Sequence, residues 1–94
     1  MNYAITNEML RGLILEMPSA TFDSHALIFR AMQQYPQQYT MDLYSFVASP
    51  DPILSLHASI GQRLLGIDAI EPTQKIKTHN VRGEKTENQE WSRK

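Results

Sequence analysis

Residues 51–66 read DPILSLHASIGQRLLG and predict one well-delimited helix. Asp51 is a favourable N-cap, Pro52 suits the first helical position, and Gly66 suits the position just past the helix end. At about 100° per residue, the apolar side chains collect on one half of this helix, which we expect to be buried. That half contains Ile53, Leu54, Leu56, His57, Ile60, Gly61, Leu64 and Leu65.

The other arc of this helix carries small or hydrogen-bonding side chains and no acidic one. Its members are Ser55, Ala58, Ser59, Gln62 and Arg63. We expect this arc to face outward, where it can approach another surface closely. On the buried side, His57 is predicted to have a hydrogen-bond partner. Gly61 is predicted to be a point of close approach by Trp91 or by an earlier helix, because a mid-helix glycine costs about 1 kcal/mol relative to alanine.

Three further helices are predicted before residue 51, over residues 7–17, over residues 24–35, and from Pro36 to Ser49-Pro50. In each of them, apolar side chains recur at the three- and four-residue spacing of a helix face. Asp23 can cap the second of these helices, and proline follows or opens each of the others.

After the last helix, the chain changes from helical to extended periodicity. Residues 74–81 and 86–91 flank a turn, RGEK at 82–85, in which Gly83 can supply a positive φ. These signals predict a β-hairpin. A frayed tail is the alternative, because few large apolar side chains could anchor the strands and a lone hairpin is marginal in water. Trp91 favours the hairpin, because one indole brings a large apolar area to the edge of a core.

The 94 residues are 41% hydrophobic and 20% charged, which suits one compact domain. Residues 1–70 hold nearly all the aliphatic side chains, with three basic and six acidic residues, whereas residues 71–94 hold six basic and four acidic residues. We therefore predict a helical core over 1–70 and a C-terminal hairpin or tail of the same domain over 71–94. The predicted fold class is mainly α with a C-terminal β-hairpin, an α+β arrangement.

Several classes of function lack their characteristic residues in this sequence. There is no cysteine, no glycine-rich phosphate loop, no Gly-x-Ser-x-Gly elbow, and no pair of histidines at metal-ligand spacing. We therefore expect no enzymatic activity, metal, cofactor or small-molecule substrate. Every apolar run, such as residues 13–15, is far below the roughly 20 residues of a membrane span, and the N-terminus lacks the order of a secretory signal. We expect a cytoplasmic protein that does not associate with membranes.

The order of the predicted elements resembles that of a winged helix-turn-helix domain. A helix, a short extended stretch at Thr21-Phe22, a second helix, a later capped helix and a hairpin follow one another over residues 5–92. The resemblance implies a winged-helix-like fold of four helices followed by a two-stranded wing. It matches residues 51–65 with the recognition helix and residues 74–91 with the wing, which in that family contact DNA bases and phosphates. The implied nucleic-acid contacts are Ser55, Ser59, Gln62, Arg63, Lys75, Lys77, Arg82 and Lys85.

This resemblance implies a small DNA-binding regulatory module of a prokaryotic or phage type. Tight binding to duplex DNA uses about six to ten phosphate contacts. The chain has nine basic side chains in all, so binding to double-stranded DNA implies a homodimer. Tyr39, Met41 and Tyr44 are candidates for the dimer or partner surface, with a place in the core as the alternative.

The alternative function is a protein–protein interaction or adaptor module of the same fold that does not bind DNA. The two functions differ in where the basic side chains should lie. DNA binding is favoured if Arg63, Lys75, Lys77 and Arg82 share one side of the molecule, and a protein partner is favoured if they are dispersed. For Arg63, an ion pair with an acid such as Asp68 is a purely structural alternative.

Overall fold

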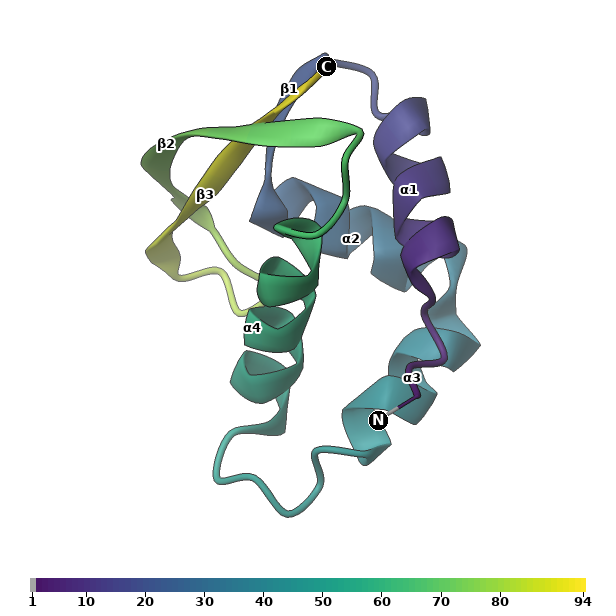
Figure 1. The fold of residues 1–94 in the computed structure, drawn as a ribbon. Helices are drawn as coiled ribbons and strands as arrows, with labels where there is room; N and C mark the ends of the chain where they lie inside the picture. Colours follow the sequence, from purple (N-terminus) through teal and green to yellow (C-terminus); the bar gives the residue numbers. More distant parts are fainter. Residues whose placement is uncertain (1) are drawn as a thin grey trace.

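The computed structural model describes residues 2–94 (Figure 1). Over this range, helices and strands follow in the order α1 (Asn7–Glu16), β1 (Thr21–Asp23), α2 (Ser24–Gln34), α3 (Pro36–Tyr44), α4 (Pro52–Leu64), β2 (Ile70–His79) and β3 (Lys85–Arg93). The helices lie close to the predicted ranges, except that α3 ends at Tyr44, well before Ser49.

The predicted fold class, with a two-stranded wing as the only β structure, is wrong. The sheet of the described chain has three antiparallel strands in the order β1-β3-β2. The short strand β1 pairs with the C-terminal end of β3, where Phe22 lies opposite Trp91. Because a lone hairpin is marginal in water, this third strand and the helices beneath it stabilise β2 and β3. The extended stretch predicted at Thr21-Phe22 is part of β1, but a strand of three residues has no periodicity that could reveal its pairing partner.

Local capping explains where the helices begin. Thr6 and Met9 form a reciprocal capping box at the start of α1. Asp23 accepts a hydrogen bond from the Ala26 amide at 2.7 Å, which fixes the start of α2. Asp51 accepts one from the Leu54 amide at 3.3 Å at the start of α4.

Trp91 joins the sheet to the helices. Its side chain is 1% exposed, and its indole Nε1 donates to Ser24 Oγ at 2.9 Å, at the first residue of α2. Ser24 Oγ in turn donates to the Gln89 carbonyl at 3.2 Å. The indole therefore adds hydrogen bonding to apolar burial at the junction of β3 and α2.

The ends of the described chain are tied into the same core. Ile5 is fully buried, and Ile70 and Trp91 belong to the same apolar cluster. Figure 1 shows the C-terminus beside the loop that follows α1. Within residues 2–94, no helix combines the length and the apolarity needed to cross a membrane.

Candidate functional site

The exposed side of α4 matches the predicted one only in part: Ala58 and Gln62 are exposed as expected, whereas Ser55, Ser59 and Arg63 are only partly exposed. Leu54 and Leu65 are 64% and 62% exposed, although the sequence placed both on the buried half. Ala58 and Gln62 are exposed beside them. The helix is turned in this way because residues 2–6, here called the N-terminal segment, cover the opposite side of α4. The expectation that both leucines are buried is therefore wrong.

Three of the four predicted DNA contacts on α4 bind other parts of the chain. Ser55 Oγ lies 2.6 Å from Ser49 Oγ. Ser59 Oγ donates to the Tyr3 hydroxyl at 2.8 Å. Gln62, in contrast, is exposed. The two half-buried serines thus have partners within the fold.

Arg63, the fourth predicted contact on α4, is held by the N-terminal segment and the start of α1. Its Nη2 donates to the Ile5 carbonyl at 2.6 Å and its Nε to Asn7 Oδ1 at 3.0 Å. Its guanidinium lies 4.0 Å from the ring centroid of Tyr3, in a cation–π contact. Burial lowers the pKa of this arginine. The alternative partner Asp68 instead pairs with Arg11.

Asp42 is the anchor of the N-terminal segment. Its two carboxylate oxygens accept hydrogen bonds from the Ala4 amide at 2.7 Å and from the Ile5 amide at 3.0 Å. The side chain is only 4% exposed. No local sequence signal reveals this role, because the partners of Asp42 are backbone amides 37 and 38 residues away.

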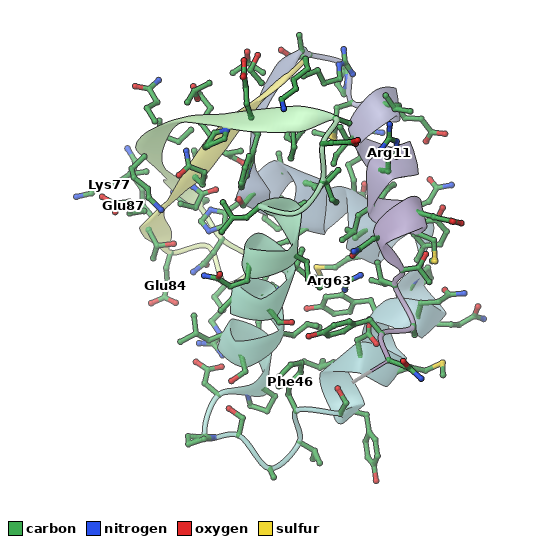
Figure 2. The ribbon with its side chains drawn as sticks, in the orientation of Figure 1. Arg11, Phe46, Arg63, Lys77, Glu84 and Glu87 are labelled. Atoms are coloured by element: carbon green, nitrogen blue, oxygen red, sulfur yellow. The ribbon has the colours of Figure 1, made fainter. Side chains whose placement is uncertain are left out.

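The basic residues of the hairpin are exposed but lie apart from Arg63. Lys77 lies opposite Glu87 and Lys85 opposite His79 in the β2–β3 register, and Lys75 lies opposite Gln89. Figure 2 shows Lys77 at the outer side of the sheet, whereas Arg63 lies on the other side of α4, toward α1. The predicted DNA contacts are therefore not gathered on one side of the molecule.

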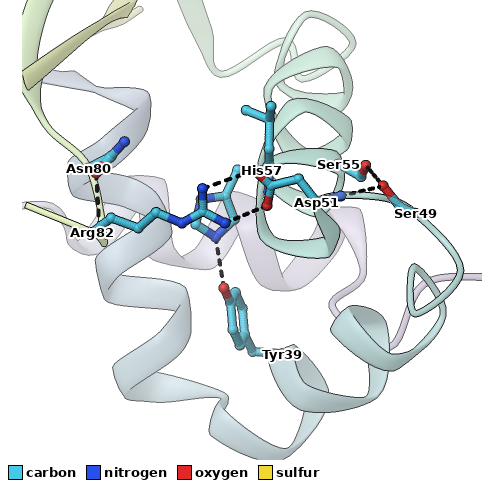
Figure 3. Close-up of polar contacts among 8 residues, drawn as sticks. Tyr39, Ser49, Asp51, Ser55, His57, Asn80 and Arg82 are labelled. Atoms are coloured by element: carbon cyan, nitrogen blue, oxygen red, sulfur yellow. Dashed lines mark hydrogen bonds and ion pairs between the residues drawn. The ribbon is translucent and has the colours of Figure 1, made fainter. Parts of the chain in front are cut away.

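Arg82 joins the tip of the hairpin to the start of α4 (Figure 3). Its guanidinium forms a two-point ion pair with the Asp51 carboxylate, with Nη1 2.9 Å from Oδ2. The hydrogen bond from Arg82 lowers the pKa of Asp51. Asp51 thus caps α4 and also holds the turn of the hairpin.

Tyr39 lies in the core and not on the candidate partner surface. Its hydroxyl is 2.7 Å from His57 Nε2 (Figure 3); Tyr39 is buried and His57 is partly buried. Burial lowers the pKa of His57 to about 4 and raises the pKa of Tyr39. At neutral pH, the imidazole of His57 is therefore neutral, and one hydrogen bond joins its Nε2 to the Tyr39 hydroxyl. His57 has the hydrogen-bond partner that the sequence predicted.

The other two candidates for the partner surface, Met41 and Tyr44, are 65% and 74% exposed. Tyr44 borders a hollow of about 420 Å³ between α3 and α4, here called the α3–α4 groove. The groove is lined by Thr40, Leu43, Tyr44, Val47, Pro52, Ile53 and Arg82. Its one charged lining residue, among those described, is Arg82, which is already paired with Asp51. The groove is therefore an almost wholly apolar surface.

Gly61 is not a point of close packing, as the sequence had predicted. A Cβ atom built at this position would meet no heavy atom within 4 Å. Among residues 2–94, no three His, Cys, Asp or Glu side chains are grouped so as to hold a metal ion. Comparison of the chain with models of known protein families, with curated proteins and with solved structures gives no match.

Proposed function

We propose that this chain is a small protein-interaction module that forms a homodimer through the α3–α4 groove. The observation that carries this proposal is the exposed apolar surface around the groove, where Tyr44 is 74% and Val47 is 64% exposed. Contiguous apolar surface of this kind marks interaction sites in folded proteins, and tyrosine is enriched in the centres of interfaces.

A second copy of the chain is the partner that suits this surface. A twofold interface sets one patch against itself, so an unpaired charge in the patch would face its own copy. The groove has no such charge, because Arg82 is paired with Asp51. The patch also combines a hollow with a protruding side chain, Tyr44, so each copy can fill the hollow of the other.

The test is the mass of the protein in solution, measured by light scattering after size-exclusion chromatography. We expect wild type to have twice the chain mass of 10.8 kDa. Val47→Glu places a charge at the groove and should give a monomer, because an unpaired charge is costly at the centre of an interface.

Leu15→Glu is the matched control, because Leu15 is an equally exposed aliphatic residue on α1. This variant should stay dimeric. A wild type that remains monomeric over the whole concentration range would contradict the proposal, as would a Val47→Glu variant that remains dimeric.

Binding to double-stranded DNA, the function implied by the winged helix-turn-helix resemblance, is the second candidate. It is favoured by the exposed lysines of the hairpin, Lys75, Lys77 and Lys85, and by the exposed Gln62 on α4. In this case the hairpin supplies the phosphate contacts, because Arg63 and Ser59 are bound to the N-terminal segment.

Fluorescence anisotropy of a labelled duplex separates the two candidates. DNA binding should weaken steeply between low and moderate salt, and Lys85→Gln should reduce it whereas Arg30→Gln on α2 should not. A duplex that shows no binding at low salt removes this candidate and leaves the homodimer untouched.

A further inference from the structure

A cleft of about 270 Å³ lies where α4, the start of α2 and the sheet meet. It shares no lining residue with the α3–α4 groove. Its volume is near the lower end of the range for small-molecule sites, which are typically about 300–1,000 Å³. The cleft is therefore large enough for a ligand built around one ring.

The interior of the cleft is apolar. Ile28 and Trp91, both almost fully buried, line it from α2 and β3. Ala58 and Leu65 line it from α4. Apolar walls with a few polar groups at defined positions are the usual composition of a ligand site.

The polar groups around the cleft favour an anion. Lys75 lines it from β2, and His25 and Gln62 line it from α2 and α4. Within the described chain, no aspartate or glutamate lines the cleft. Thr78 Oγ1 holds His25 Nδ1 at 2.9 Å, which leaves the other ring nitrogen of His25 for a ligand.

Gly61 gives independent support for a ligand in this cleft. A glycine in the middle of a helix costs about 1 kcal/mol relative to alanine, and here no packing contact compensates for it. Gly61 lines the cleft, and a larger side chain at this position would project into open space. The glycine keeps this wall of the cleft clear.

We propose that this cleft binds a small organic anion, with an apolar body about the size of one aromatic ring and one carboxylate. The ring lies beside Gly61, among the apolar residues that line the cleft. The carboxylate is bound by Lys75, with Gln62 as a hydrogen-bond donor and His25 beside it. This ligand site does not depend on the proposed dimer. The cleft and the α3–α4 groove have no lining residue in common, so the two proposals can be tested separately.

Benzoate is the probe, and benzamide is its neutral counterpart of the same shape. Binding is followed by two-dimensional NMR of the labelled protein, with the indole N–H of Trp91, the chain's one tryptophan, as the reporter. We expect benzoate to shift this signal in a saturable way and benzamide to bind about tenfold more weakly, because hydrogen bonds to a charged group are the stronger ones.

Two variants locate the site. Lys75→Gln should weaken benzoate binding, whereas Lys77→Gln, which removes a lysine that does not line the cleft and lies opposite Glu87 in the strand register, should not. Gly61→Leu should fill the cleft and abolish binding while the protein remains folded, because leucine is a better helix former than glycine. The proposal is overturned if benzoate gives no saturable shift, if benzamide binds equally well, or if folded Gly61→Leu binds benzoate as wild type does.

Discussion

Asp42 shows how one side chain can decide what a whole helix presents to solvent. By binding the amides of Ala4 and Ile5, it holds the N-terminal segment where Tyr3 meets Ser59 and Arg63. Those contacts cover one side of α4, and the exposed leucines lie on the other. The identity of the exposed face therefore depends on a carboxylate in a different helix.

Replacement of Asp42 by alanine should lower the free energy of unfolding by about 2–3 kcal/mol, because it leaves two enclosed amides without acceptors. Urea denaturation followed by circular dichroism measures the change. Asp68→Ala removes a carboxylate that is 79% exposed and should change stability by less than about 0.5 kcal/mol. Equal effects of the two substitutions would show that Asp42 does not anchor the segment.

His57 makes stability depend on pH. Burial, with smaller contributions from His25 and Arg82, lowers its pKa from 6.5 to about 4 in the folded chain. The unfolded chain therefore binds a proton first as the pH falls, so stability is complete above 6.5 and decreases between 6.5 and about 4. The imidazole is only partly enclosed, and solvent screening limits this loss to about 1 kcal/mol.

His57→Gln should flatten this part of the stability profile, measured by denaturation at a series of pH values. His79→Gln changes an exposed histidine in the hairpin and should leave the slope as in wild type. A slope that survives in His57→Gln would assign the pH dependence to another group.

Gly61→Ala should raise the free energy of unfolding by about 0.5–1 kcal/mol, because alanine is the better helix former and its Cβ meets open space. Gly83→Ala is the contrasting substitution. Gly83 has a φ of 78°, which alanine adopts only with strain, so this variant should be less stable than wild type. Thermal denaturation should show a higher melting temperature for Gly61→Ala and a lower one for Gly83→Ala than for wild type. A destabilised Gly61→Ala would reveal packing against this glycine.

At the scale of elements, Arg93 connects the last strand to the first helix. Its Nη1 donates to the carbonyls of Ile14 at 3.1 Å, in the last turn of α1, and of Met17 at 2.8 Å, the C-cap residue of that helix. Carbonyls at a helix C-terminus have no partner within the helix, and a cation is favourable there. Arg93 therefore acts as a cap supplied by a strand.

Arg93→Ala should lower the free energy of unfolding by about 1 kcal/mol, and amide hydrogen exchange should show the largest loss of protection in α1. Lys94→Ala removes the adjacent, exposed charge and should have little effect. Loss of protection spread evenly over the chain would mean that Arg93 does not stabilise α1 specifically.

The difference between local and long-range contacts explains which helices and strands could be predicted. The helices follow from local signals, such as Asp23 before α2 and Asp51 before α4, which act within three residues. Strand β1 depends instead on pairing with a segment about 70 residues away, where Phe22 meets Trp91. No local pattern in three residues contains that information, so the sheet could not be completed from the sequence.

For the whole molecule, the site was harder to predict than the fold. Periodicity correctly placed Leu56, Ile60 and Leu64 in the core, but it could not say which flank of that stripe would be covered. Which flank is covered depends on the contact between Asp42 and the N-terminal segment, which are far apart in the sequence. Met41 and Tyr44, which the sequence offered as candidates for a partner surface, are both exposed, but only Tyr44 lines the groove, and the groove itself was not predicted.

The proposed homodimer leads to a prediction about the stability of the whole assembly. If folded dimers unfold to separate chains, the melting temperature must rise with protein concentration. A tenfold increase adds about 1.4 kcal/mol per dimer, which corresponds to about 3–5 °C for an assembly of this size. Differential scanning calorimetry over a hundredfold range of concentration should show this rise for wild type and for Leu15→Glu. It should be absent in Val47→Glu, and a melting temperature of wild type that does not change with concentration would be incompatible with the dimer.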